Sequence, residues 1–352
     1  MANSPNPPSV AFVDPCCAGG YDLPDLETGG LGGTEATVLR VGAALRRRFC
    51  VTHYQAGRTN CIQSAAGELR PLGKPFHAQA ADVMIVLNRW KVAVKLRKRY
   101  PDTPIFLWLH VYPGRHNRAM GAALKAAGIT VICVSGTHAR SLATFLGRSD
   151  CPGVTFIYNP VADDLQPDGS ARDSNMLLFA SSPHKGLGQV FEQFAALRLS
   201  VPSLTLAVAD PGYLRWDTGT VPDGVSFLGA LPHPTLVRHM RQALCLFYPQ
   251  TSFAETFGLV LAEANAVGTP VLIHEGLGAN DEVVADPDQR IDGHDPAAIL
   301  HRIVEWRRTA PLVTVNPAFR LAKIADVWAE FLQSALRRGP ANAAAYLPAR
   351  EA

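Results

Sequence analysis

Two glutamates eight residues apart, Glu255 and Glu263, are the residues whose type and spacing point most directly to chemistry. They lie in the run TSFAETFGLVLAEANAVGTPV. Glu255 precedes a Thr-Phe-Gly turn, and from Leu259 the apolar residues follow a helical repeat that a Gly-Thr-Pro turn ends. The pattern predicts that Glu255 sits at the mouth of a helix and that Glu263 lies about two turns inside it.

The start of such a helix can bind a ligand that carries phosphates. Its first backbone N–H groups have no partner within the helix and carry the positive end of the helix dipole. A carboxylate only accepts hydrogen bonds, so two carboxylates here fit a ligand with hydroxyls at both ends and phosphates between them, as in a nucleotide-sugar. The spacing alone also fits an ordinary N-terminal charge at Glu255 and a solvated helix face at Glu263.

Length and composition predict a globular protein with two domains. The chain has 352 residues, enough for two domains that each bury a core. A net charge of +3 is too small to argue for nucleic acid as a partner. The N-terminus lacks the features of an export signal and no apolar run has membrane-spanning length, so we expect a cytoplasmic protein.

Neither the cysteines nor the aspartates predict a metal site. The seven cysteines are scattered, with one vicinal pair, Cys16 and Cys17, and no Cys or His spacing of the kind that binds zinc. We therefore expect free thiols. Asp163, Asp164 and Asp210 fall in predicted loops that do not converge, so no metal is expected.

The N-terminal half alternates short apolar strands with helices. We expect strands at 9–14, 49–55, 83–87, 105–110, 129–135 and 154–157, and helices at 35–48, 89–99, 118–127 and 137–146. This alternation predicts a parallel doubly wound sheet, which binds ligands at the carboxyl ends of its strands. His110 ends one such strand, although a packed or surface histidine is the commoner case there. The glycine-rich loop at 29–33 allows close approach to a ligand or simply forms a flexible turn.

The same alternation restarts after a polar stretch at 162–175, which we interpret as a linker between domains. Strands are expected at 176–180, 204–208, 225–228, 244–248 and 271–274, and helices at 188–197 and 232–242. Lys185 lies in a loop between a predicted strand and a helix. This position suits the binding of a phosphate, although most lysines are simply exposed.

These segments together resemble the retaining GT-B glycosyltransferases of family 4, the glycosyl transferases group 1. In the C-terminal half the matching segments are 225–229, 236–240, 243–249, ETFGL at 255–259, 263–264 and GTPV at 268–271; in the N-terminal half they are 29–35, 110, 134–135 and 157–161. The resemblance implies two Rossmann-like α/β domains that face a cleft, at 1–165 and 170–316. It also implies a C-terminal helix in 317–352 that returns to the N-terminal domain and ends in a flexible tail.

The resemblance implies catalytic roles for three residues. Glu255 would face the donor sugar, Lys185 would neutralise the leaving diphosphate, and His110 would reach the sugar near its anomeric carbon. Fixed donors around the diphosphate lower the barrier because negative charge grows there as the glycosyl–phosphate bond breaks. The family commonly has an arginine about five residues before the lysine, whereas Ala180 and Ser181 stand at that place in this chain.

A second group of residues would bind the donor without reacting. Glu263 would hold the ribose hydroxyls. The other donor-binding residues implied by the resemblance are Gly32, Gly33, Ser182, Phe257, Gly258 and Leu259. The two N-terminal glycines would let their loop close over the sugar, and the last three residues would offer backbone amides to it.

The function implied is that of a retaining hexosyltransferase in bacterial polysaccharide or glycolipid synthesis. Its donor would be a UDP- or GDP-sugar, its acceptor a glycan, a glycolipid or another lipid-linked or small molecule, and neither a cofactor nor a metal would be required. A glycosidase mechanism is not expected, because both glutamates would be occupied with hydroxyls. Two alternatives share the fold, namely a nucleotide-sugar epimerase and a non-catalytic sugar-nucleotide-binding protein.

A basic segment at 89–100, RWKVAVKLRKRY, raises the question whether the protein acts at a membrane. It is a predicted helix with six basic residues and an interleaved Trp90. A basic amphipathic helix of this kind can lie on an anionic bilayer, which would suit a lipid-linked acceptor at the inner face of the membrane. The segment equally fits a solvated helix whose apolar side, with Val92, Leu96 and Tyr100, packs on the sheet.

Overall fold

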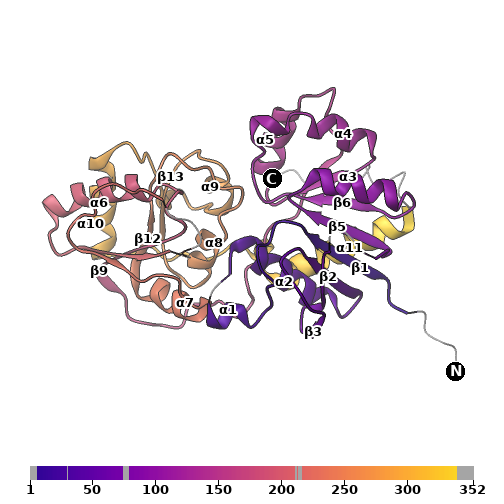
Figure 1. Cartoon of the computed structure of the whole chain (residues 1–352). Coiled ribbons are helices and arrows are strands. Elements are labelled where there is room, and N and C mark those ends of the chain that lie inside the picture. Colours follow the sequence, from indigo (N-terminus) through magenta and orange to yellow (C-terminus); the bar gives the residue numbers. More distant parts are fainter. Residues whose placement is uncertain (1–5, 30, 74–78, 211, 213–215, 339–352) are drawn as a thin grey trace. The chain divides into compact units, whose positions relative to one another are not determined.

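A computed structural model of the chain describes residues 6–29, 31–73, 79–210, 212 and 216–338. The chain forms two compact units, each built on its own sheet (Figure 1). The first unit comprises residues 1–23, 34–160 and 321–352, and the second comprises residues 24–33 and 161–320. Gly30 and the tail expected at the C-terminus, from residue 339 on, lie outside the described residues.

The first unit contains an eight-stranded sheet in the order β3-β4-β2-β1-β5-β6-β7-β8. The strands are β1 Ser9–Asp14, β2 Cys50–Gln55, β3 Ile62–Ser64, β4 Gly67–Pro71, β5 Val83–Leu87, β6 Ile105–Trp108, β7 Thr130–Cys133 and β8 Val154–Phe156. Neighbouring strands are parallel except β3 and β4, which are antiparallel. The predicted doubly wound sheet is confirmed for this half. Strands β3 and β4 were not predicted from the sequence, because they are short and partly exposed.

Helices cover both faces of this sheet (Figure 1). They are α2 Gly33–Leu45, α3 Trp90–Arg99, α4 Met120–Ala126, α5 Gly136–Leu146 and α11 Leu321–Arg338, with a 3₁₀ turn η1 at Arg115–Asn117. Successive side chains of a strand point to opposite faces. Val13 accordingly packs in the core beneath α3, whereas Phe12 and Trp108 face α11, where the Trp108 and Trp328 rings lie 4.6 Å apart. The C-terminal helix therefore returns to the N-terminal sheet, as the resemblance implies.

A buried histidine in β2 makes the stability of this unit depend on pH. His53 is buried, its Nε2 lies 3.1 Å from the Ala66 carbonyl oxygen, and burial lowers its pKa to about 4. The unfolded chain binds a proton at this side chain near pH 6.5. The free energy of unfolding should therefore fall as the pH drops from about 6.5 to about 4, by roughly 3 kcal/mol from this group alone.

Urea denaturation at pH 7.5 and pH 5 measures this effect. His53→Gln keeps a donor for the Ala66 carbonyl oxygen but cannot titrate, so its free energy of unfolding should change less between the two pH values than that of the wild type. An equal change in both proteins would show that His53 does not cause the pH dependence.

The second unit contains a six-stranded parallel sheet in the order β11-β10-β9-β12-β13-β14. The strands are β9 Asp173–Ala180, β10 Thr205–Ala209, β11 Val225–Phe227, β12 Ala243–Tyr248, β13 Val271–His274 and β14 Arg290–Ile291. The strand order reverses between β9 and β12. Open α/β sheets bind ligands at the carboxyl ends of the strands at such a switch point. The loops that follow β9 and β12 are therefore where a ligand is expected.

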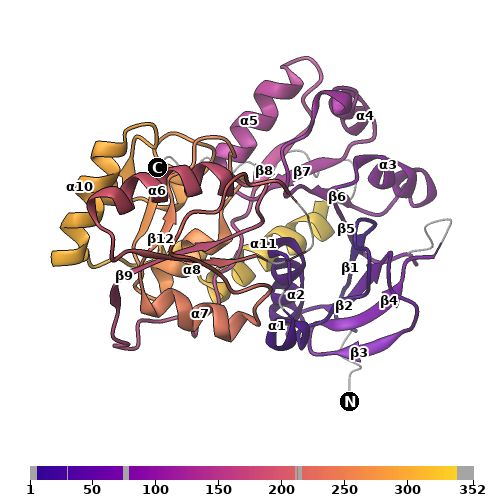
Figure 2. The same ribbon diagram turned by 60° about the vertical axis from the view of Figure 1, so that its left-hand side comes forward.

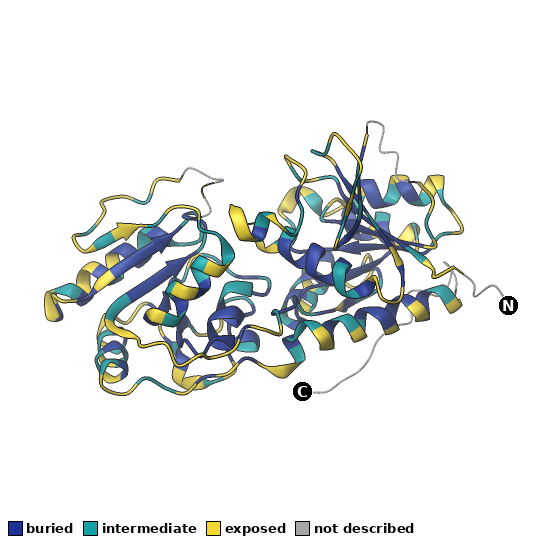
Figure 3. Ribbon diagram, turned by 90° about the horizontal axis from the view of Figure 1, so that it is seen from below, coloured by how far each residue is buried: buried dark blue, intermediate teal, exposed yellow. Residues whose placement is uncertain are grey.

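The helices of this unit pack on both faces of its sheet. They are α1 Asp25–Thr28, α6 Leu187–Ser200, α7 His233–Gln242, α8 Leu259–Ala266, α9 Asn280–Val283 and α10 Pro296–Arg308, with 3₁₀ turns η2 Pro287–Gln289 and η3 Pro317–Phe319. Helices α6 and α10 pack together on one face, and α7 and α8 on the other (Figure 2). The strands are mostly buried while the outer sides of the helices are exposed (Figure 3). Because β9 begins at Asp173, the end of the polar stretch interpreted as a linker belongs to the sheet.

Candidate functional site

The loops that follow β9 and β12 bring Lys185 and Glu255 into direct contact. Lys185 Nζ lies 2.9 Å from Glu255 Oε1 and 3.2 Å from Oε2. The Glu255 side chain is nearly buried, with 8% of its surface exposed, whereas 24% of the Lys185 side chain is exposed. Two residues that the sequence analysis selected separately thus form an ion pair at the switch point of the sheet.

A buried glutamine shapes the loop that carries Glu255. Gln250 Oε1 accepts the backbone N–H groups of Ser252 and Phe253 at 2.9 and 2.7 Å. Gly186, in the other loop, has a φ of +88°, and a Cβ on it would lie 2.7 Å from the Cβ of Gln250. Glycine alone suits both the left-handed backbone and this space. The two loops therefore pack directly on one another.

Helix α8 begins at Leu259, where the apolar repeat predicted it. Gly258 precedes it with a φ of +84° and a ψ of +60°, a conformation that glycine adopts readily. Glu263 is 4% exposed and lies about one turn inside the helix. The expected depth of two turns is wrong because Glu255 stands in the preceding loop. Phe257, which directly precedes Gly258, is buried.

Glu263 has a partner that the sequence analysis did not find. His233, the first residue of α7, places its Nε2 3.1 Å from Glu263 Oε1. The two side chains are 19% and 6% exposed. The alternative of a solvated helix face at Glu263 is therefore wrong. Since 30 residues separate the pair, no local pattern could have revealed the contact.

Glu255 has a second partner in Tyr248, the last residue of β12. The Tyr248 hydroxyl lies 3.1 Å from Glu255 Oε1, the oxygen closest to Lys185. Burial, and then the negative charge of Glu255, raise the pKa of Tyr248 well above its usual value. The phenol therefore keeps its proton, and its O–H donates a hydrogen bond to the carboxylate, which can only accept.

The loop after β9 also contains Ser182 and His184. Ser182 is buried and its Oγ lies 3.0 Å from His184 Nδ1. Burial, and then the charge of Lys185, lower the pKa of His184. Lys185 Nζ also lies 4.9 Å from the centroid of the Phe253 ring, a cation–π contact. Since a lowered pKa favours the neutral imidazole of His184, the group of this loop that pairs with Glu255 is Lys185.

His110 belongs to the first unit and lies two residues beyond β6, not within the strand as predicted. Its backbone N–H donates to Asn88 Oδ1 at 2.7 Å, and the ring packs 4.7 Å from that of Trp108. Burial, and then the neighbouring His138, lower the pKa of His110 to about 3. The imidazole is therefore neutral near pH 7 and can form a hydrogen bond with a hydroxyl group.

The glycine-rich loop ends where α2 begins. Gly33 is the first residue of that helix and is exposed, and Gly32 directly precedes it. The carboxyl end of strand β1 holds a buried carboxylate, Asp14, that was not predicted from the sequence as a site residue. Asp14 is 4% exposed and accepts the Tyr21 hydroxyl at 2.9 Å and the Cys16 backbone N–H at 2.8 Å. These bonds fold the loop at the switch point between β1 and β5.

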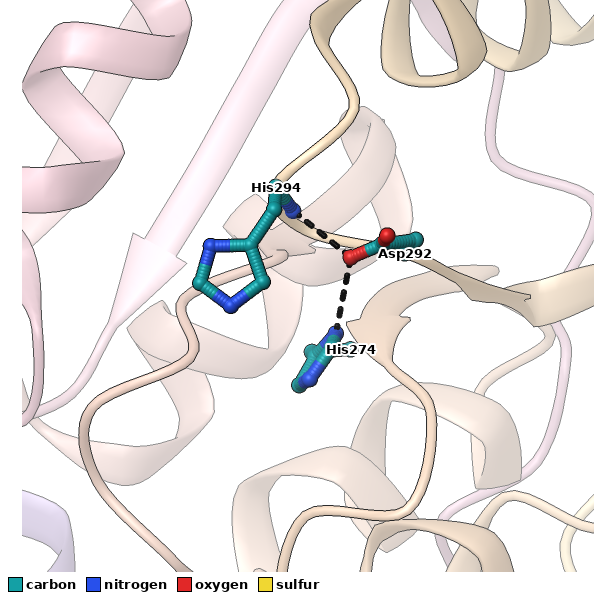
Figure 4. A group of neighbouring side chains, drawn as sticks. All are labelled: His274, Asp292 and His294. Carbon is teal, nitrogen blue, oxygen red and sulfur yellow. Dashed lines mark hydrogen bonds and ion pairs between the residues drawn. The ribbon is translucent and has the colours of Figure 1, made fainter.

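Figure 4 shows a group with the chemistry of metal ligands, formed by His274 at the end of β13 and by Asp292 and His294 after β14. The candidate ligand atoms lie within 4.8 Å of one another. His274 Nδ1 accepts the Gly293 N–H at 3.0 Å, and Asp292 Oδ1 accepts the His294 N–H at 2.9 Å. Because Nδ1 of His274 accepts the Gly293 N–H, the neutral ring carries its proton on Nε2, and neither ring nitrogen has a lone pair left for a cation. We therefore interpret this group as a hydrogen-bonded turn.

Comparison with known proteins finds similarity to one family over most of the second unit. Residues 164–308 match the model of the glycosyl transferases group 1. D-inositol 3-phosphate glycosyltransferase of Thermobifida fusca is 32% identical over 234 residues, which cover 57% of this chain and 53% of that protein. Phosphatidyl-myo-inositol mannosyltransferase of Mycolicibacterium smegmatis is 31% identical over 133 residues, which cover 36% and 34%. The chain thus matches about half or less of the length of these relatives.

A solved structure gives the fold. AviGT4, a glycosyltransferase involved in avilamycin A biosynthesis, matches with a TM-score of 0.60 at 18% identity, over 94% of this chain and 99% of that one. Two α/β units with parallel sheets and this likeness define a protein of the GT-B fold, as the sequence analysis expected. Within this fold, residues 164–308 are similar to the glycosyl transferases group 1.

Proposed function

We propose that the protein transfers a hexosyl group from a nucleotide-sugar to an acceptor with retention of anomeric configuration. The contact between Lys185 and Glu255 at the switch point of the second sheet carries the proposal. The lysine can pair with a diphosphate, and the glutamate can accept hydrogen bonds from sugar hydroxyls. The loop after Glu255 leads to the N-terminus of α8, where backbone N–H groups can bind an anion. Glu263 on this helix suits the two ribose hydroxyls.

The chemistry follows from the charges of these groups. In the proposed reaction Lys185 moves from Glu255 to the diphosphate and offsets the negative charge that grows as the glycosyl–phosphate bond breaks. The backbone amides of Phe257, Gly258 and Leu259 lie at the positive end of α8 and act in the same sense. Glu255 accepts hydrogen bonds from the sugar, and its charge favours the positive charge that develops there. No metal is required in this scheme.

The remaining site residues have supporting roles in this proposal. Ser182 shapes the lysine loop, Gly32 and Gly33 permit close approach of the N-terminal loop, and His110 acts as a neutral hydrogen-bonding group for the sugar. Neutrality suits His110, because a cation beside a sugar that develops positive charge would oppose the reaction.

For the acceptor we propose a glycan or a lipid-linked polyol, in bacterial polysaccharide or glycolipid synthesis. The names of the two relatives support this choice, since one refers to D-inositol 3-phosphate and the other to phosphatidyl-myo-inositol. The donor is proposed to be a UDP- or GDP-sugar.

Nucleoside diphosphate release tests the proposal. A thermal-shift screen of UDP- and GDP-sugars first selects a donor, because a ligand that binds only the folded state raises the melting temperature with its concentration. Incubation with that donor should release nucleoside diphosphate slowly, and faster with acceptor. Interconversion of donor sugars without release would identify an epimerase. Binding with neither reaction would identify a sugar-nucleotide-binding protein.

Membrane contact through the basic segment is a separate proposal. In helix α3 the apolar residues Val92 and Leu96 are buried in the core, and Arg97 donates to three backbone carbonyls. None of these three side chains is therefore available to a bilayer. Among the described helices, none is long and apolar enough to span a membrane. Any contact of α3 with anionic lipid would therefore be mainly electrostatic, through its exposed basic residues, which include Lys95 and Lys98.

Sedimentation with liposomes measures this contact. Binding should rise with the fraction of anionic lipid, fall as salt screens the charges, and decrease in a Lys95→Gln/Lys98→Gln variant. Lys125→Gln, which removes an exposed charge from α4, is the control and should sediment as the wild type does. A wild-type protein that stays in the supernatant on strongly anionic vesicles at low salt would favour a soluble acceptor.

A further inference from the structure

We propose that Tyr248 is a positioning residue that holds the Glu255 carboxylate in its reactive orientation while Lys185 moves to the diphosphate. The inference rests on the proposed function, because it assigns a role in the catalytic step. It concerns the bond from the Tyr248 hydroxyl to Glu255 Oε1.

The need for such a residue follows from the geometry of the ion pair. Lys185 contacts both carboxylate oxygens of Glu255, which is nearly buried. Once the ammonium group turns to the diphosphate, it no longer fixes the plane of the carboxylate. A buried carboxylate that loses a charged partner is costly unless other hydrogen bonds compensate. The Tyr248 bond to Oε1 does not depend on the lysine and persists through the exchange.

Tyr248 is more buried than Glu255 and Lys185, its neighbours in the site. It ends β12, is paired with Ile273 of β13, and has 1% of its surface exposed. Its ring lies 5.6 Å from that of Phe179 in β9, so it packs against the strand on the other side of the switch point. Lys185, by contrast, is partly exposed on a loop. The hydroxyl therefore provides a fixed point for a carboxylate whose other partner must move.

The protonation of Tyr248 also suits this role. Burial, and then Glu255, raise the pKa of the phenol well above its usual value, so the hydroxyl keeps its proton near neutral pH and can donate a hydrogen bond. Hydrogen bonds with Ser181 and Gln250 act in the opposite direction on the pKa of Tyr248. They are compatible with the role, because the phenolic oxygen can accept hydrogen bonds while its O–H donates one to Glu255.

Tyr248→Phe tests the proposal because it removes the oxygen and keeps the ring. In the full chain, kcat for donor turnover should fall about tenfold to hundredfold, the range for loss of a hydrogen bond to a charged group. The affinity for the nucleoside diphosphate should stay within about twofold, since the sugar-facing carboxylate is not part of that complex. Tyr54→Phe is the matched control. Tyr54 is also buried, and its hydroxyl accepts a backbone N–H from Gln79 in the first unit, so kcat should be unchanged.

A double-mutant cycle separates positioning from a structural role. If Tyr248 acts through Glu255, Tyr248→Phe should have little further effect on kcat in a Glu255→Gln background. Fully additive losses, or a Tyr248→Phe variant with the wild-type kcat, would overturn the proposal. A wild-type protein that turns over no donor would overturn the proposed function, and the role of Tyr248 would fall with it.

Discussion

Lys185→Ala should lower kcat by about a hundredfold to a thousandfold, the usual cost of removing a group that stabilises developing negative charge. The affinity for a nucleoside monophosphate should change little, because the ammonium group serves the diphosphate. The loss should therefore be larger for nucleoside diphosphate than for monophosphate, and largest in turnover. Steady-state kinetics and calorimetric titration of the two nucleotides measure these three quantities.

The control for this experiment must separate charge from packing. Lys185→Arg keeps a positive charge but cannot match the compact ammonium, so it should recover part of the lost kcat. Lys125→Ala removes an exposed lysine of the first unit and should leave kcat unchanged. Equal losses of affinity for monophosphate and diphosphate would contradict the role of Lys185 at the leaving group.

The parallel sheets could be predicted because their strands are buried on both faces. Such strands give apolar runs, as in Val83–Leu87 and in the first three residues of Val271–His274, and both strands are observed with the predicted bounds. The hairpin of β3 and β4 has no such run. These strands are short, lie at the edge of the sheet and are partly exposed, so their sequence does not distinguish them from a loop.

The site could be predicted only where its signals are local. The Gly258 turn, the apolar repeat from Leu259 and the lysine between a strand and a helix are all patterns within a few residues. The partners of the two glutamates are different. Tyr248 looks like the end of an ordinary buried strand, and His233 like the start of an ordinary helix, until the fold brings each to its carboxylate. Contacts between distant residues, and not residue types, complete the site.

The two glutamates should separate binding from turnover. Glu263→Ala should mainly weaken nucleotide affinity, because a carboxylate that accepts two ribose hydroxyls makes charge-assisted bonds worth at most about 1.5–3 kcal/mol each. Glu255→Ala should mainly lower kcat, since its carboxylate faces the sugar, where positive charge develops in the transition state. Titration with nucleoside diphosphate and steady-state kinetics on both variants measure the two effects.

His233 supplies a matched control for the Glu263 variant. Removing Glu263 takes away the partner of the His233 ring, so some loss of affinity could arise from a displaced α7. His233→Ala keeps the carboxylate and removes only its neighbour. If Glu263 binds the ribose itself, His233→Ala should weaken nucleotide binding far less than Glu263→Ala. Equal losses would assign the effect to the pair as a structural unit, and wild-type affinity and turnover in both glutamate variants would place the donor site elsewhere.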